Sequence, residues 1–459
     1  MEYQLTDFLP TTKKELELRG WDYVDVILFS ADAYVDHPSF SVAVIGRTLE
    51  AAGYRVAIVP QPDWHGDYRD FKKLGRPRLF FGIAPGCMDS MVNKYTAARR
   101  LRSEDAYSPD GRHDMRPEYP TIVYTKILKQ LFPDVPVVIG GIEASLRRVT
   151  HYDYWQDRLR PCILCDSGAD MITYGMGEKP TLELARQLSD GIAIADIRDI
   201  PQTVYLASGI TPTPDDIVLN SHEECLNNKR SQAENFRHVE EQSNMMHAHR
   251  LIQPLTSHLS PLTTCVVINP PYPPMTTAEL DASFDLPYTR QPHLKYKGKR
   301  IPAYDMIKHS VNIHRGCFGG CAFCTISAHQ ARSSHAAPRK AFCERSGRLS
   351  RCPTSRATSV TWADLLPICM ECTDAIMLPV NAASVPAASI RRYVPTSTPT
   401  TRGCSKSTMP SMPCQASRKA SQAVAYATTY YYIEVRTRPP TVPLRSTPVN
   451  SSLAMSVAG

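Results

Sequence analysis

Short apolar runs alternate with longer amphipathic stretches between residues 25 and 190 of the chain. The runs that read as strands are DVILFS (25–30), YRVAIVP (54–60), RLFFGI (78–83), VPVVIGG (135–141) and the run around MITYG (171–175). Between the first two, residues 40–53 have apolar positions at helical spacing and end in Gly53, a residue that commonly stops a helix. This alternation is typical of βαβ units around a parallel sheet, so we predict an N-terminal doubly wound α/β domain.

The loops that follow these strands are rich in Gly, Asp and His. They cover residues 30–40, 82–89, 140–148 and 175–178. Ligands of open parallel sheets bind beyond the carboxyl ends of the strands, so these loops are candidates for a binding site. Tight turns would also account for the glycines, and on sequence alone that interpretation is favoured. Turn formation and helix capping explain the polar loop residues equally well, so no catalytic residue is assigned among them; they are Asp36, His37, Glu143 and Glu178.

Two regions of different composition follow this domain. Residues 191–250 are polar and strongly charged, which predicts solvated helices or a helical connector. Residues 254–304 contain many prolines and are expected to form an ordered linker between domains, without much regular structure. VNIHRG (311–316) then predicts a short strand that leads directly into a group of cysteines.

Three cysteines stand close together in the segment HRGCFGGCAFCTIS. They are Cys317, Cys321 and Cys324, with two glycines between the first and the second. Such a glycine-containing segment can fold tightly enough for three thiolates to face one metal cluster, and three thiolates leave one iron of a four-iron cluster open. A structural zinc site is the alternative, and it would need a fourth protein ligand such as His314 or His329. The pair Cys162 and Cys165 lacks a partner pair nearby, so burial is the favoured interpretation there.

The net charge of +7 is not spread evenly along the chain. Residues 331–459 hold 16 Lys and Arg against 5 Asp and Glu, whereas residues 1–330 hold 36 against 40. The mildly acidic body gives no electrostatic reason to expect a nucleic-acid partner. No signal peptide and no apolar run of membrane-spanning length is recognisable, so we expect a cytoplasmic protein without membrane contact, in which 14 cysteines indicate metal binding or burial rather than disulfides.

The cysteine spacing resembles the signature of radical S-adenosylmethionine (SAM) enzymes, including the aromatic Phe323 before the third cysteine. Several further stretches resemble the YgiQ family of radical SAM proteins: SADAYVDHPSF (30–40), GGIEASLRR (140–148), YGMGE (174–178), LPYTRQPH (286–293) and SVNIHRGCFGGCAFCTISAHQ (310–330). The resemblance covers nearly all of residues 1–330. It implies a cobalamin-binding-like N-terminal domain followed by a radical SAM partial (β/α) barrel. The chain lacks an Asp-x-His-x-x-Gly segment, which argues against a bound cobalamin.

The same resemblance implies the cofactors and their ligands. A 4Fe-4S cluster would be held by Cys317, Cys321 and Cys324, with SAM on the open iron and its adenine against Phe323. Reductive cleavage of SAM would give a deoxyadenosyl radical that acts on a substrate the resemblance does not identify. An electron donor such as flavodoxin or ferredoxin would be a partner.

The resemblance stops after Gln330. Residues 331–459 are rich in Ser, Thr, Pro, Ala and Arg, hold only 3 of the 22 glycines, and show no usable period. Three segments of this tail permit family-like peptides when their possible codons are read in one shifted frame. We therefore predict a reading-frame shift after Gln330, an irregular or disordered C-terminal third, and an inactive polypeptide as written.

The expected organisation has four parts: the doubly wound domain over 1–200, the helical connector and proline-rich linker over 201–304, the start of a radical SAM domain over 305–330, and the shifted tail over 331–459. The alternative function is a non-catalytic small-ligand-binding protein with a structural zinc site. Nucleic-acid binding through the basic tail is disfavoured, because the charge of the tail follows from its reading frame.

Overall fold

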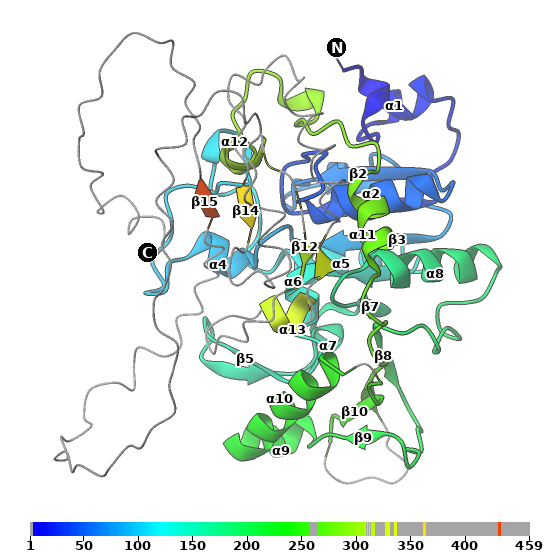
Figure 1. The fold of residues 1–459 in the computed structure, drawn as a ribbon, viewed down its shortest axis with the longest axis vertical. Coiled ribbons are helices and arrows are strands. Elements are labelled where there is room, and N and C mark those ends of the chain that lie inside the picture. Colours follow the sequence, from blue (N-terminus) through cyan, green and yellow to red (C-terminus); the bar gives the residue numbers. More distant parts are fainter. Residues whose placement is uncertain are drawn as a thin grey trace, which may run out of the picture.

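The computed structural model describes residues 3–245, 247–256, 264–308, 310, 312, 314–316 and 326–330, together with the short strands at 335–336, 361–363 and 430–432. Its centre is a nine-stranded sheet in the order β2-β1-β3-β4-β7-β8-β11-β10-β9 (Figure 1). The first five strands in this order are parallel to one another: β2 Val56–Pro60, β1 Val26–Ser30, β3 Phe80–Ala84, β4 Val137–Ile139 and β7 Met171–Thr173. The five apolar runs predicted as strands are thus confirmed, and their order is that of a doubly wound domain with a switch point between β1 and β3.

Alternating residues of each parallel strand enter two different cores. Ile27 and Phe29 of β1 belong to one core, and Val26 and Leu28 belong to the other. The first core packs against the helices on its face, which are α3 Arg69–Lys72, α5 Pro120–Leu131, α7 Ile163–Ser167 and α10 Lys229–Ser243. The second core packs against α2 Ser41–Ala51 and α8 Glu178–Ser189. The predicted helix at 40–53 is therefore α2, and Gly53 follows it with a φ of 92°.

The sheet continues well beyond the parallel part. Strand β8 Thr203–Ala207 pairs antiparallel with β7 and with β11 Cys265–Ile268, and β10 Leu251–Pro254 then carries β9 Ile217–Val218 at the edge. The expectation of helices in the 191–250 region is confirmed for α9 His222–Asn227 and α10, but the region also holds β8 and β9. One sheet also crosses the boundary predicted at residue 200.

The remaining elements lie outside this sheet. Upstream they are η1 Leu5–Asp7, α1 Lys13–Leu18, α4 Ser90–Lys94, η2 Pro109–Gly111, α6 Gly141–Leu146 and the hairpin of β5 His151–Asp153 with β6 Arg158–Arg160. Downstream they are α11 Thr277–Phe284, η3 Leu294–Tyr296, α12 Pro302–Ile307, β12 His314–Arg315 and α13 Ile326–Gln330. The region 254–304 therefore holds more regular structure than its prolines predicted. Strand β12 confirms the predicted strand before the cysteines and pairs with β13 His335–Ala336, while β14 Thr361–Ala363 pairs with β15 Tyr430–Tyr432.

A segment that contains two prolines, residues 286–293, packs over the loop after β1. Val35 forms a β-bridge with Pro292, and the backbone N–H of Asp36 donates to the carbonyl oxygen of Gln291 at 3.0 Å. The backbone N–H of Thr289 donates to the Asp36 carboxylate at 2.8 Å. We call residues 286–293 the strap, because they tie the region before the cysteines to the first loop of the sheet.

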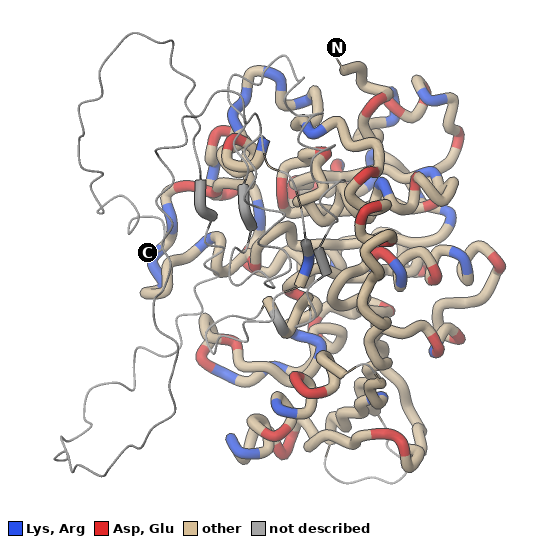
Figure 2. Tube along the Cα trace, in the orientation of Figure 1, with Lys and Arg blue, Asp and Glu red and all other residues tan. Residues whose placement is uncertain are grey.

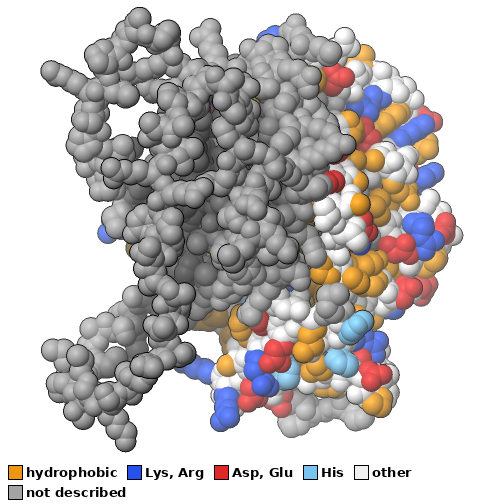
Figure 3. Space-filling model, viewed as in Figure 1, with side chains coloured by type: hydrophobic (Ala, Val, Ile, Leu, Met, Phe, Trp, Pro, Cys, Tyr) orange, Lys and Arg blue, Asp and Glu red, His pale blue; other side chains and the backbone are white. Residues whose placement is uncertain are grey.

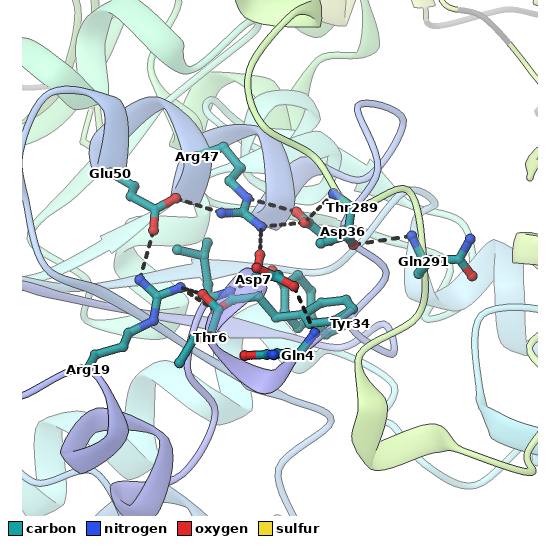
Figure 4. A network of polar contacts seen from close by, with 12 residues as sticks. Gln4, Thr6, Asp7, Arg19, Tyr34, Asp36, Arg47, Glu50, Thr289 and Gln291 are labelled. Carbon is teal, nitrogen blue, oxygen red and sulfur yellow. Dashed lines mark hydrogen bonds and ion pairs between the residues drawn. The ribbon is translucent and has the colours of Figure 1, made fainter. Parts of the chain in front are cut away.

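A buried ion pair holds the same loop from the other side. Both carboxylate oxygens of Asp36 accept from the Arg47 guanidinium, at 3.0 and 2.5 Å, and neither side chain is more than 4% exposed. Arg47 also donates to Glu50 and to the carbonyl oxygen of Asp7, which joins the N-terminal segment to α2 (Figure 4). Asp36 is therefore a structural residue, because its carboxylate accepts hydrogen bonds from α2 and from the strap.

The charged and apolar side chains of the described surface are mixed. Figure 2 shows Lys and Arg interspersed with Asp and Glu along the described part of the chain. On the face shown in Figure 3, apolar side chains of the described residues lie scattered among charged ones. None of the described helices is long and apolar enough to cross a membrane.

Candidate functional site

A cavity of about 350 Å³ opens at the carboxyl ends of the parallel strands. Each of the four loops predicted from the sequence contributes to its wall: Pro38 and Ser39 after β1, Gly86 to Met88 after β3, Gly140 to Ile142 after β4, and Gly175 to Glu178 after β7. The four loops therefore converge, as the carboxyl ends of parallel strands require. The interpretation of their glycines as turn residues alone is incomplete, since several of them form this wall.

Two of these glycines leave no room for a side chain. A Cβ at Gly140 would lie 3.0 Å from Oγ1 of Thr173, and Gly141 has a φ of 75° with Pro85 Cδ 3.0 Å from the position of a Cβ. Larger residues here would push the loop after β4 away from its neighbours or strain its backbone. The pair of glycines thus brings bare backbone up to the edge of the cavity.

A buried ion-pair cluster fixes the loop after β3. The Arg116 guanidinium, which is fully buried, pairs with Asp32 at 2.7 Å and with Asp105 at 2.8 Å. The other oxygen of the Asp32 carboxylate accepts from the backbone N–H of Cys87 at 2.7 Å, and a Cβ at Gly86 would lie 2.2 Å from the same carboxyl group. Burial raises the pKa of Asp32 above its usual value despite the adjacent Arg116. This cluster positions the loop and does not line the cavity.

The opposite wall of the cavity comes from both sides of the cysteine segment, residues 317–324. Before it lie Asn312 and Arg315, and after it lie Ile326, His329 and Gln330. The backbone N–H of Gly316 donates to Oε1 of Gln330 at 3.4 Å, which joins the two sides. Residues on both sides of the cysteine segment thus line the same cavity as the loops of the doubly wound domain.

Polar contacts hold the upstream side against that domain. The Arg315 guanidinium forms an ion pair with Glu178, the first residue of α8, and lies 5.2 Å from the centre of the Phe284 ring. The Ser283 hydroxyl donates to the same Glu178 oxygen at 3.3 Å, and the Ser39 hydroxyl donates to Oδ1 of Asn312 at 3.2 Å. Glu178 is therefore an anchor for the residues that precede the cysteines.

His329 has an unusual environment on the downstream side. Its Nδ1 is buried and has no hydrogen-bond partner among the described residues. Burial and the nearby Arg148 cation lower the pKa of His329 to about 4, so its ring is neutral at pH 7. Arg148 is itself buried. It donates to Ser145 O and to Ser243 Oγ, and it lies 4.8 Å from the centre of the Tyr174 ring.

Other polar residues of the predicted loops lie away from the cavity wall. His37 is fully buried; its Nδ1 accepts from the Ser39 backbone N–H at 3.1 Å, and its Nε2 lies 3.3 Å from Arg290 Nη1. Glu143 accepts from the Ser90 backbone N–H at 3.0 Å and from the Thr121 hydroxyl at 2.6 Å, and burial raises its pKa. Both serve structure, which agrees with the simpler interpretation of these residues.

The cysteines of the described region do not form a metal site. Cys87 reaches the cavity wall, where its Sγ lies 3.3 Å from Ser39 O, and burial raises the pKa of its thiol well above the usual value. Cys162 is buried as expected, but Cys165 is exposed. No group of three metal-ligating side chains occurs among the residues that the structure describes. The predicted ligands Cys317, Cys321 and Cys324, and the predicted adenine contact Phe323, lie outside the described residues.

The fold and the cavity define a doubly wound domain with a cavity at the carboxyl edge of its sheet, lined in part by residues before and after the cysteine segment. The family model "Radical SAM N-terminal" matches residues 8–310, and the chain belongs to this radical SAM family. Its curated relatives are UPF0313 proteins. It is 67% identical to one from Bacteroides thetaiotaomicron over 72% of this chain and 54% of the relative. It is 43% identical to UPF0313 protein YgiQ of Escherichia coli over 71% of this chain and 50% of the relative.

The chain spans about half the length of the curated relatives it matches. Among solved structures it is similar to the radical SAM methyltransferase TsrM from Kitasatospora setae, with a TM-score of 0.35 and 15% identity over 71% of this chain and 45% of that one. That structure contains a tryptophan substrate and a SAM analogue. A likeness of this size says nothing about the chemistry of the present chain.

Proposed function

We propose that this protein is the cluster-bearing part of a radical SAM enzyme. Cys317, Cys321 and Cys324 would hold a 4Fe-4S cluster, SAM would bind its open iron, and Phe323 would contact the adenine. When bound, these cofactors supply reductive cleavage of SAM to a deoxyadenosyl radical that abstracts hydrogen from an unknown substrate. Electrons would come from a donor such as flavodoxin or ferredoxin, and the reaction would take place in the cytoplasm.

The observation that carries this proposal is that residues on both sides of the cysteine segment line one cavity in a chain of this family. Arg315 precedes Cys317 by two residues, Ile326 follows Cys324 by two, and both Arg315 and Ile326 line that cavity. This arrangement supports a cluster site beside the cavity. The unpartnered Nδ1 of His329 adds a neutral hydrogen-bonding group on the same side.

A structural zinc site in a non-catalytic binding protein is the second candidate. It is favoured by that same His329 nitrogen, because zinc would need a fourth protein ligand and this ring is neutral and unpartnered. His314, the other histidine considered, lies in β12. The two candidates differ in whether a protein side chain or SAM completes the metal coordination.

Anaerobic reconstitution separates them. The chain is incubated with iron and sulfide, or with zinc alone, and the metal, sulfide and visible absorbance are measured for the native protein and for single Cys→Ala variants. We expect a cluster that is lost when Cys317, Cys321 or Cys324 is replaced and retained in the Cys165→Ala control, whose exposed thiol lies far from the segment in sequence. If the chain instead binds one zinc without sulfide, and His329→Ala loses that zinc, the result would refute the radical SAM proposal and support the zinc-containing binding protein.

A cobalamin-binding-like role for the N-terminal domain is part of the same hypothesis. The histidine of the loop after β1 is His37, which is fully buried and held by Ser39 and Arg290. It therefore has no free nitrogen to offer a cobalt from the cavity side. If a corrinoid binds, we expect it to bind without a histidine ligand from this loop, and hydroxocobalamin titration by absorbance would test this.

The tail after Gln330 forms a separate part of the proposal. We infer that a base was lost near codon 331, so that residues 331–459 do not supply the strands of a SAM-binding barrel and this polypeptide is inactive as written. Sequencing the DNA across codons 328–333 tests the inference. An intact frame, together with tail peptides in the native protein, would refute it; a restored frame should bring back SAM cleavage with the same three cysteines.

A further inference from the structure

The cavity does not stop at the carboxyl edge of the sheet but extends into the doubly wound domain. Its inner wall includes Leu28, Phe80 and Val138 from β1, β3 and β4, and Val44 and Ile45 from α2. Domain interiors are normally packed as closely as organic crystals, with few voids larger than a water molecule. The whole cavity, of about 350 Å³, has the size of a small-molecule site. It also lies at the switch point between β1 and β3, where sheets of this order bind ligands.

The lining is almost free of charge. Among the described lining residues, only Glu178 and Arg315 carry a formal charge, and they are paired with each other. A charged ligand group placed deeper would lose its hydration without meeting a counter-charge there, which is costly. The occupant that this lining favours is therefore uncharged in its inner part.

Two polar atoms without partners mark where such a ligand could form hydrogen bonds. Among the residues that the structure describes, the buried Ser41 Oγ in the first turn of α2 has no hydrogen-bond partner, and neither has His329 Nδ1. The rest of the described lining mixes apolar residues with uncharged polar ones such as Thr173 and Thr181, and Gly140 and Gly177 add no side chains to it. Apolar surface with a few hydrogen-bonding groups suits an uncharged ring that is apolar on its faces and polar at its edge.

We propose that this cavity is a ligand site of the doubly wound domain for a planar, uncharged heteroaromatic ring system. This site goes beyond the cluster chemistry proposed above, since its inner wall comes from β1, β3, β4 and α2. The ring would lie between the sheet and α2, with one edge at Ser41 and the other toward His329 and the sides of the cysteine segment. No covalent step is involved.

The test uses the metal-free full chain, so it does not depend on the cluster. Riboflavin, whose ring is uncharged, is titrated and followed by flavin fluorescence. We expect saturable riboflavin binding to the folded chain. Absence of riboflavin binding to the folded chain would overturn the proposal.

Variants locate the binding. Val44→Phe adds a ring into the cavity, and we expect it to weaken riboflavin binding by about tenfold or more, with folding checked by circular dichroism. Val218→Phe, the same change on the exposed edge strand β9, is the matched control and should leave binding unchanged. Ser41→Ala barely changes packing and should weaken binding a few-fold. Riboflavin affinity unchanged in both Ser41→Ala and a folded Val44→Phe would refute this location.

Discussion

The buried Arg116 offers a sharp test of how the cavity wall is held. Its guanidinium is fully buried, pairs with two carboxylates at 2.7 and 2.8 Å, and also donates to Pro85 O at 3.2 Å. Replacing it by Met keeps much of the volume but leaves Asp32 and Asp105 buried without a cation. Removing one partner of a buried ion pair lowers the free energy of unfolding by about 3–5 kcal/mol. We therefore expect Arg116→Met to lower the apparent free energy of unfolding by about that amount at pH 7.

Urea denaturation followed by circular dichroism measures this loss, and Arg186→Met is the matched control. Arg186 also pairs with two carboxylates, Glu183 at 2.6 Å and Asp190 at 2.8 Å, but its side chain is 57% exposed. Because water screens exposed ion pairs, the control should be nearly as stable as the native chain. Equal losses in the two variants would show that the Arg116 cluster does not stabilise the loop after β3.

The pH dependence of Arg116→Met gives a second readout. Burial already raises the pKa of Asp32 above its usual value, and removing the cation should raise it further. An acid with a higher pKa in the folded state binds more protons when folded, so the stability of the variant should fall as pH rises through that pKa. Adding Asp32→Asn and Asp105→Asn to Arg116→Met should recover part of the loss and remove this slope.

Three further changes test other parts of the site. Gly86→Ala places a Cβ against a buried carboxylate at a φ of 115° and should cost about 1–3 kcal/mol, whereas Gly209→Ala, with a φ of 69° and open space around it, should cost less in the same thermal unfolding assay. Glu178→Gln weakens the hold on Arg315, so limited proteolysis should cut faster around residues 312–330; an unchanged cutting rate would contradict the anchoring role. The pKa of His329, lowered to about 4, means that the unfolded chain binds more protons between that value and its ordinary pKa, so stability should rise with pH over this range. His329→Asn should flatten that rise, and an identical pH profile would show that the ring is not buried as described.

The parallel half of the sheet was predictable because its strands are short, apolar and separated by amphipathic helices. Buried parallel strands such as β1 and β3 have no polar face to obscure the pattern. The antiparallel extension was missed because β9 has only two residues and β8 lies in a region, 191–250, that is polar and charged as a whole. Strand β11 was missed because it lies in the proline-rich region 254–304, where little regular structure was expected.

The sequence was enough to predict that the loops of the site lie together, but it did not predict the hydrogen bonds and ion pairs that hold them. Their position after strands places them at one edge, whatever their composition. The contacts that hold them join residues far apart in sequence, such as Arg116 with Asp32 and Thr289 with Asp36. The unpartnered Ser41 hydroxyl had no sequence signal, because a serine near a helix start is ordinarily taken as a cap.

The strap limits where the chain can be truncated without loss of stability. A fragment that ended before residue 286 would leave the Asp36 carboxylate without the Thr289 backbone donor and would uncover Val35 and Tyr34, both fully buried in the intact chain. Exposing them would favour aggregation of such a fragment. Workable truncations must therefore keep residues 286–293, which makes the residues leading to the cysteines an integral part of the smallest stable unit.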